Sequence, residues 1–419
     1  MTMLSQQQRI FFEFLRFCIG TVQEVPSSLK GADWRVLYTM ARKQCLVGVL
    51  FDGIKRLPAD VGMDKGLLFQ WMAQNQTLRK TNARLDKAAV EVAEWFGRKG
   101  FRTCVLKGQG NALLYPSGME RTPGDIDIWV EGGDKRVISF VRSISPHEKA
   151  CYHHIEFPSY KGVEVEVHYR PSFLLCFWHN RKLQKYYERV KEEQFSHRVM
   201  LGAKGEIAIP TAEFNLIFQL TQIYAHLMNE GIGLRQLVDY FFLLKNTDFI
   251  GNTNGVSGNT NGGAFGANTN CSDNTNKSLG NTDGDGFLLN TDFTDNTDRI
   301  GGNADRVDRR LLQDELRELG LWEFAGAVMY IMKEVFGMPA SRLIVPPHEK
   351  CGKFVLNEVL EAGNFGKHDA RNRFGRSQFG HNLQRVYRDI RLVRYFPAEA
   401  LSEPIFRTWH FFWRCYQKM

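Results

Sequence analysis

Residues 103–130 read TCVLKGQGNALLYPSGMERTPGDIDIWV, and this stretch decides the fold. It predicts a short strand at 102–106, because the residues there are mostly apolar, and then a Lys-Gly-Gln-Gly turn at 107–110. The turn leads into the start of a helix, a loop with proline and glycine follows, and a second apolar strand ends the stretch. A strand, a glycine turn and a helix in this order are typical of a phosphate-binding α/β unit.

The second strand carries two aspartates, Asp125 and Asp127, separated by one residue. Because side chains alternate along a strand, the two carboxylates share one face, and Ile126 and Ile128 point to the other face, toward a core. Two negative charges this close together are costly unless a cation lies between them. The pair therefore predicts a metal site.

A later strand supplies a partner for these aspartates. Residues 163–168 read VEVEVH, so Glu164, Glu166 and His168 share one face and three valines share the other. Three carboxylates on adjacent strands can hold one or two Mg²⁺ ions and leave positions for water and phosphate. We select Glu166 as the third ligand beside Asp125 and Asp127, with Glu164 as the alternate. His168 could orient the ligands, contact a phosphate or act as a base on the acceptor side.

The glycine turn is the candidate nucleotide-binding element. The backbone N–H groups of Lys107, Gly108 and Gln109 suit a phosphate, and the ammonium of Lys107 adds a charge for a triphosphate. Arg121 comes shortly before the aspartates, and we expect it to reach the same phosphates.

A zinc site is a rival interpretation of the same strands. His153 and His154 lie on the preceding predicted strand, and alternation requires one of them to face Glu164, Glu166 and His168. This interpretation is less favoured because it leaves the two aspartates without a role.

The rest of the chain divides by pattern into regions of helix, strand and low complexity. Within the low-complexity region the dipeptide Asn-Thr recurs among Gly, Asp and Ser, which predicts disorder; its segment 281–286 resembles half of a calcium loop, a weak match. The predicted regions are an N-terminal helical region at 1–98, an α/β core at 99–210, a helical extension at 211–245, an insertion at 246–304 and a C-terminal helical region at 305–419.

The helical extension contains three polar residues of interest. His226 lies on an apolar helix, where a single histidine is usually a packing residue. Arg235 and Asp239 are four residues apart after a glycine break, and this spacing predicts a local ion pair.

Composition narrows the class of protein. The chain has 419 residues, of which 43% are apolar and 24% charged, and its eight cysteines form no Cys-x-x-Cys pair. We expect reduced core thiols in a cytoplasmic protein, with neither a disulfide framework nor a cysteine zinc site. The N-terminus lacks the features of a signal peptide, and no apolar run is long enough to predict a membrane span.

The charge is distributed unevenly. The net charge is +8, but residues 246–298 carry −6, so the remainder carries +14. Such a surplus of positive charge suits a partner that bears phosphate, and a nucleic acid is a less favoured partner of this kind. Arg385, Arg388 and Arg391 form a stripe on one helix face, which is either solvated or a basic rim that meets phosphates.

The chain resembles a known family in several segments: Val105–Gly108, Arg121, Asp125–Ile128, Glu166–Arg170, and Gly231–Arg235 with Asp239. These segments are similar to the polymerase-β-type nucleotidyltransferase superfamily. They resemble more closely a bacterial family labelled uncharacterised nucleotidyltransferase, over roughly residues 30–245.

The resemblance implies an α+β fold, in which a small mixed sheet is flanked by helices. It also implies dependence on Mg²⁺ or Mn²⁺ and transfer of a nucleoside monophosphate from an NTP, such as ATP, to an acceptor hydroxyl on a small molecule or a protein. The superfamily's usual Gly-Ser or Gly-Gly after the first strand is here Gly108-Gln109, so the serine that would contact the triphosphate is missing. A non-catalytic member that binds a nucleotide or a partner is therefore the alternative.

Overall fold

The strand that follows Asp125, β2 (Ile126–Val130), lies inside a four-stranded sheet in this computed structural model. The strand order is β1 (Thr103–Val105), β2, β4 (Val163–His168) and β3 (His154–Tyr160). β2 is antiparallel to β1 and parallel to β4, and β3 and β4 form an antiparallel hairpin. The expected small mixed sheet of an α+β fold is therefore confirmed.

The structure describes most of the chain outside the low-complexity region. β7 (Asp248–Ile250) lies within the predicted insertion and pairs in parallel with β8 (Arg306–Asp308), so the chain leaves and re-enters the described part at one two-stranded ribbon. The predicted calcium-loop segment 281–286 lies outside the described residues. The described residues are 4–58, 63–250, 306–367, 369, 371 and 378–417.

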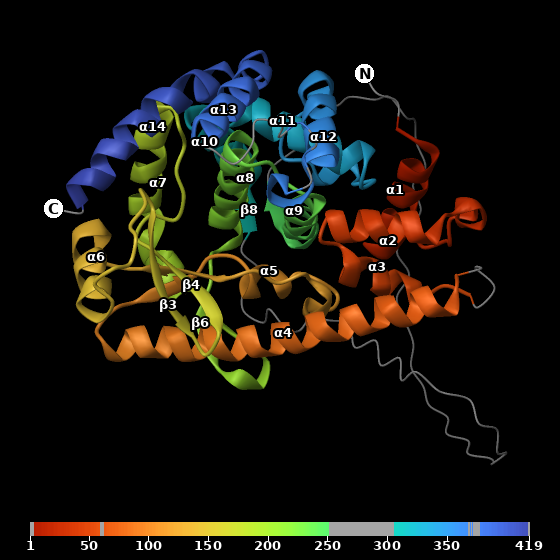
Figure 1. The fold of residues 1–419 in the computed structure, drawn as a ribbon, viewed down its shortest axis with the longest axis horizontal. Coiled ribbons are helices and arrows are strands. Elements are labelled where there is room, and N and C mark those ends of the chain that lie inside the picture. The colour runs from red at the N-terminus through yellow and green to blue at the C-terminus, as the bar shows by residue number, and fades with distance from the viewer. Residues whose placement is uncertain are drawn as a thin grey trace, which may run out of the picture. The chain divides into compact units, whose positions relative to one another are not determined.

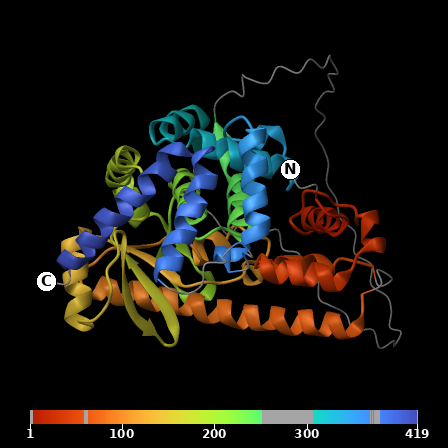
Figure 2. The ribbon, with the colours of Figure 1, turned by 45° about the horizontal axis from the view of Figure 1, so that its top comes forward.

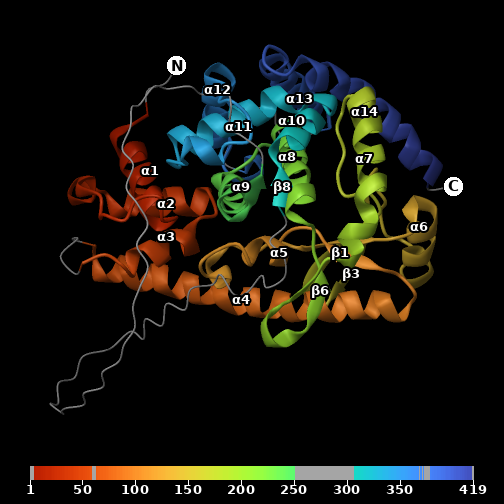
Figure 3. The same cartoon turned by 180° about the vertical axis from the view of Figure 1, so that it is seen from behind.

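One face of the sheet is apolar and buried. Ile126, Ile128, Val165 and Val167 are at most 3% exposed and form one core with two helices, as the alternation predicts. The helices are α4 (Lys65–Arg98), a single helix, and α6 (Gly133–Ile144), which connects β2 to the hairpin. Figures 1 and 3 show α4 running beneath the sheet along its whole width.

The N-terminal helices pack against the far end of α4 (Figure 1). They are α1 (Gln6–Cys18), the 3₁₀ turn η1 (Ser27–Gly31), α2 (Trp34–Lys43) and α3 (Val47–Ile54). Asp33 caps α2 by accepting hydrogen bonds from the N–H groups of Arg35 and Val36. A Cβ at Gly48 would lie 2.0 Å from the backbone oxygen of Glu120, so α3 packs directly on η2 (Gly118–Glu120), the turn before Arg121.

Helices also cover part of the polar face of the sheet. Trp129, which shares this face with Asp127, packs against Phe195 of α7 (Phe177–Ser196) and stacks on Phe214 of α8 (Ala212–Asn229). The hydroxyl of Thr211 caps α8, and the short hairpin of β5 (Arg198–Met200) and β6 (Glu206–Ala208) connects α7 to α8 around η3 (Gly202–Lys204). α9 (Leu234–Asn246) packs beside α8.

The C-terminal helices lie on the side of the sheet opposite α4 (Figure 2). The C-terminal elements are α10 (Arg309–Glu318), α11 (Trp322–Glu334), η5 (Ala340–Arg342), α12 (Glu349–Ala362), η6 (Asn364–Gly366), α13 (Gln378–Val393) and α14 (Pro397–Gln417).

Within the described residues, no helix combines the length and the apolar character that a membrane span requires.

The predicted arginine stripe lies on α13, which packs on α8. Its members differ in their surroundings: Arg385 is exposed, whereas Arg391 donates to Glu358 of α12 at 3.2 Å. The stripe is therefore not a uniform solvated face.

Candidate active site

Three carboxylates converge on the polar face of the sheet. The parallel pairing of β2 and β4 places Asp127 opposite Glu166, and Asp125 directly precedes β2. One oxygen from each side chain lies within 4.8 Å of the others, and we name these three residues the carboxylate cluster. The structure thus brings together the three predicted metal ligands, whereas Glu164 is exposed at the surface and is not part of this cluster.

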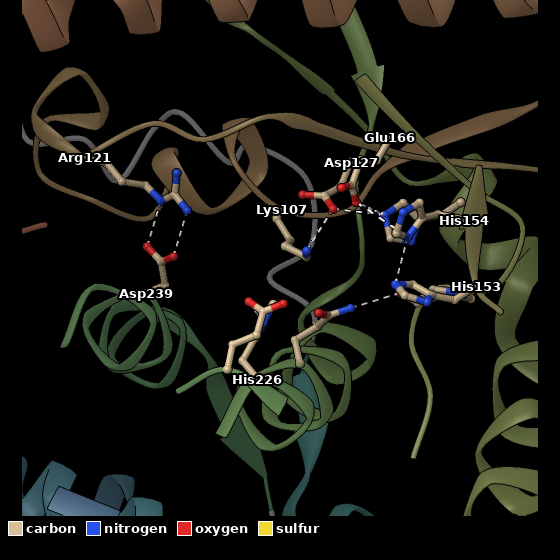
Figure 4. Close-up of polar contacts among 12 residues, drawn as sticks. Lys107, Arg121, Asp127, His153, His154, Glu166, His226 and Asp239 are labelled. Atoms are coloured by element: carbon tan, nitrogen blue, oxygen red, sulfur yellow. Dashed lines mark hydrogen bonds and ion pairs between the residues drawn. The ribbon is translucent and has the colours of Figure 1, made fainter. Parts of the chain in front are cut away.

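Lys107 contacts the cluster directly. Its Nζ donates to Oδ1 of Asp127 at 2.8 Å (Figure 4). Gly108 has a φ of +50°, a conformation that favours glycine, and it turns the chain from β1 into the short helix α5 (Gln109–Ala112). Gln109 is buried, and it does not line the small pocket that lies beside the cluster and is described below.

A group of histidines supports the cluster from one side. Nε2 of His168 lies 3.0 Å from Oδ1 of Asp127 and 3.5 Å from Oε2 of Glu166. Nδ1 of His154 lies 3.7 Å from Oε2 of Glu166 and 3.0 Å from Nε2 of His153. As expected, one of the two, His154, faces His168, but His153 approaches it as closely, and the ring centroids of both lie 5.3 Å from its ring.

The reason is a difference in backbone position. His154 faces His168 from the paired position on β3, whereas His153 precedes β3, where strand alternation no longer directs its side chain.

The pKa values show that negative charge is in excess. The charge of Asp127, and then burial, raise the pKa of Asp125 to about 6. Burial opposes the charge of Asp127, yet Lys107 and His168 lower its pKa well below the usual range. Burial likewise opposes a charge on His168, but hydrogen bonds to Asp127 and Glu166 raise its pKa to about 9. The charge of Lys107 also acts to lower the pKa of Asp125, but it does not offset the charge of Asp127 and the burial.

A small pocket of about 70 Å³ opens beside the cluster, with room for several water molecules. Lys107, Gly108, Asp125 and Asp127 form one wall. The other residues come from the loop before β2, from α5, α8 and α9, and from η6: Asn111, Arg121, Gly124, Gln219, Gln222, Ile223, His226, Arg235, Gln236, Asp239 and Phe365.

Arg121 is engaged by a protein side chain in this pocket. Its Nε and Nη2 both donate to Asp239 at 2.8 Å, and the hydroxyl of Tyr115 donates to the same carboxylate at 2.6 Å (Figure 4). Asp239 is 4% exposed, and burial opposes its charge, yet Arg121 lowers its pKa. The predicted pairing of Asp239 with Arg235 is wrong, because Arg121 takes both carboxylate oxygens.

Arg235 remains as a buried cation at the pocket. Its Nη1 donates to the backbone oxygen of Thr122 at 3.2 Å, while its Nε has no hydrogen-bond partner among the described residues. Burial, and then the charge of Arg121, lower its pKa. An arginine of this kind is suited to bind an anion, because its guanidinium has donors left over.

His226 was expected to be a packing residue, but it lines the pocket. Burial, and then the charge of Lys107, lower its pKa to about 3, so it is neutral at physiological pH. No local sequence pattern indicated that His226 would lie at the pocket, whereas Arg235 lies in a segment that carries the family resemblance.

The zinc alternative keeps part of its predicted ligand set. Nitrogen and oxygen atoms of His154, Glu166 and His168 also lie within 4.8 Å of one another, but Glu164 does not join them. His168 is already held by Asp127, so this set competes with the carboxylate cluster for the same side chains.

The residues of the cluster fit Mg²⁺, which prefers carboxylate oxygens and usually keeps several waters. Carboxylates on neighbouring strands, beside a lysine at a glycine turn, are an arrangement suited to phosphoryl chemistry on nucleotides. Fold and site thus agree with the nucleotidyltransferase class that the sequence resembles.

Comparison with known families agrees. The chain belongs to the family described as uncharacterised nucleotidyltransferase, whose model matches residues 30–254. All the predicted site residues fall within this match, and membership supports a general role in nucleotidyl transfer. No curated protein and no solved structure matches the chain.

Proposed function

We propose that the protein transfers a nucleoside monophosphate from an NTP to an acceptor hydroxyl, with Mg²⁺ held by Asp125, Asp127 and Glu166. The observation that carries the proposal is the convergence of these three carboxylates within 4.8 Å, with an excess of negative charge expressed in the raised pKa of Asp125. The bound metal would stabilise charge on the phosphate oxygens during transfer.

The protein's own cations would bind the phosphates. Lys107 Nζ lies beside Asp127 and lines the pocket, and Arg235 has an unpartnered Nε at the same pocket. Because the pocket holds about 70 Å³, it suits phosphate groups, and the nucleoside would extend toward the opening. We assign Arg121 the role of positioning Asp239 and the pocket wall, in place of the phosphate contact expected from the sequence.

The proposed reaction is a single displacement. The acceptor oxygen forms a bond to the α-phosphorus, the bond from that phosphorus to the bridging oxygen breaks, and pyrophosphate leaves. The hydroxyl proton passes to a carboxylate of the cluster.

The test measures transfer and binding separately. Protein is incubated with each α-³²P-labelled NTP, Mg²⁺ or Mn²⁺, and fractionated cell extract as acceptor, and label is followed in protein and small-molecule fractions. The variant Asp125→Asn/Asp127→Asn should lose transfer and Mn²⁺ binding by electron paramagnetic resonance. Glu164→Gln is the matched control and should retain both. Equal binding and transfer by the double variant and the wild type would refute the proposal.

A non-catalytic nucleotide-binding protein is the second candidate, and Gln109 favours it. This residue replaces the serine expected after the turn, and its side chain is buried away from the pocket lining. NTP and Mn²⁺ binding that depends on Asp125 and Asp127, without label transfer to any fraction, would support this candidate.

A further inference from the structure

We propose a second metal site, formed by Cys176, His179 and Glu399, that binds Zn²⁺ where α7 meets α14. Cys176 is the N-cap residue of α7, His179 lies one turn further on, and Glu399 lies in the first turn of α14. Figures 1 and 3 both show these two helices side by side. One donor atom from each residue lies within 4.8 Å of the others.

The carboxylate of Glu399 is fixed in its orientation. Its Oε2 accepts hydrogen bonds from the backbone N–H groups of Leu175 at 2.6 Å and Cys176 at 3.1 Å. The residue is 2% exposed, and its Oε1 has no hydrogen-bond partner among the described residues. A buried carboxylate oxygen without a partner is costly, so its position toward the cysteine and the histidine indicates an absent cation.

The separation of the donors matches a shared metal better than a direct bond. Nδ1 of His179 lies 3.5 Å from Oε1 of Glu399, beyond the usual hydrogen-bond length of about 2.9 Å. Zinc bonds of about 2.0–2.1 Å in a tetrahedron place two such ligands about 3.3 Å apart. A thiolate, an imidazole and a carboxylate form a ligand set typical of Zn²⁺, whereas Mg²⁺ avoids sulfur.

The histidine ring is also held in place by its surroundings. A Cβ at Gly320 would lie 2.4 Å from Cε1 of His179, so the imidazole packs against bare backbone between α10 and α11. The side chain of His179 remains 27% exposed, which leaves a path for metal entry and a fourth coordination position for water. The expectation that no cysteine serves a zinc site is thereby revised for Cys176.

The site would tie distant parts of the chain together. Cys176 and Glu399 are 223 residues apart, and α7 follows the strand that carries Glu166. A metal that binds the folded state and not the unfolded chain would stabilise the fold. This inference does not depend on nucleotidyl transfer.

Cobalt provides the test, because thiolate-bound Co²⁺ absorbs through sulfur-to-metal charge transfer and oxygen-bound Co²⁺ does not. Metal-free full-length Asp125→Asn/Asp127→Asn protein is titrated with Co²⁺, so that the carboxylate cluster does not contribute. One equivalent should produce the charge-transfer band, and added Zn²⁺ should abolish it by displacement. In the same background, Cys176→Ser should show no band and His179→Gln should weaken Co²⁺ binding at least tenfold.

Cys351→Ser is the matched control, since Cys351 lies near His348 and Glu323 in another group of metal-binding side chains. This variant should keep the band. Absence of the band in the parent, its survival in Cys176→Ser, or its loss in Cys351→Ser would each overturn the proposal. Circular dichroism of each variant establishes that it is folded, and His179→Gln, which changes a partly exposed residue, provides a second variant if Cys176→Ser is not.

Discussion

The Arg121–Asp239 pair lines the same pocket as Asp125 and Asp127 of the carboxylate cluster, but the charges of the pair and of the cluster are balanced in different ways (Figure 4). Arg121 gives two hydrogen bonds to Asp239, and Tyr115 gives a third, so the buried carboxylate is fully compensated. In the cluster, Lys107 and His168 both contact Asp127, while the pKa of Asp125 is raised by its neighbour's charge.

This difference distinguishes the Arg121–Asp239 pair, which has a structural role, from the carboxylate cluster, for which we propose a functional one. A buried pair with all its hydrogen bonds made holds two elements together and has no capacity left for a ligand. Carboxylates that crowd without enough cations are costly in the free protein, and the cost is recovered only when a metal binds. The comparison predicts that mutations in the pair will lower stability, whereas mutations in the cluster will lower activity.

The largest expected effect is on activity in the cluster. Asp125→Asn should reduce transfer about 10⁴-fold, equivalent to about 5 kcal/mol in the barrier, because a metal ligand is lost. Stability of the metal-free protein at pH 8 should not fall, since the substitution also removes repulsion with Asp127. Transfer of α-³²P label and urea unfolding measure the two quantities, and a large loss of stability would contradict the comparison.

The buried pair should show the opposite behaviour. Asp239→Ala leaves the guanidinium of Arg121 buried without its carboxylate and should reduce the free energy of unfolding by about 3–5 kcal/mol. Asp314→Ala, which breaks the exposed pair with Arg317, is the matched control and should cost less than about 1 kcal/mol. Similar losses in both variants, measured by urea unfolding, would remove the structural role of Asp239.

The next prediction concerns Arg235, the cation at the pocket that we expect to bind the ligand. Arg235→Met should weaken NTP binding about 10- to 100-fold, because one charge-assisted contact to phosphate is worth about 1.5–3 kcal/mol. Mn²⁺ binding should be unchanged, since Arg235 is not a metal ligand. Isothermal titration with a non-hydrolysable NTP measures the affinity, and an unchanged value would exclude the phosphate contact.

The smallest effect on stability is expected for Asp389 and Glu403, two carboxylates outside the pocket. They test whether crowded carboxylates are costly elsewhere in the protein. Burial, and then the charge of Glu403, raise the pKa of Asp389 to about 7. A carboxyl whose pKa is raised on folding stabilises the protein in its protonated form, so stability should fall as pH rises through about 7.

Asp389→Asn should remove this part of the pH dependence and be more stable than wild type at pH 8 by about 1–2 kcal/mol, after allowance for solvent screening. Urea unfolding from pH 5 to pH 8 measures the difference. Parallel profiles for the variant and the wild type would show that crowded carboxylates carry no cost here.

Several features of the fold and site were predictable from local sequence. The alternation of residues 163–168 placed Glu166 and His168 on one face and the valines in the core, and the structure has this arrangement. These features depend on a few neighbouring residues, so a short window of sequence contains the information.

The sequence by itself therefore determined the sheet, the face that carries its carboxylates, and the family. Tertiary structure alone decided which partner each charge takes: Asp239 pairs with Arg121, 118 residues away, and not with Arg235 four residues away. It also placed His226 at the pocket and Glu399 beside Cys176. Such choices depend on how helices pack and on which charges lose water together, and no local pattern contains that information.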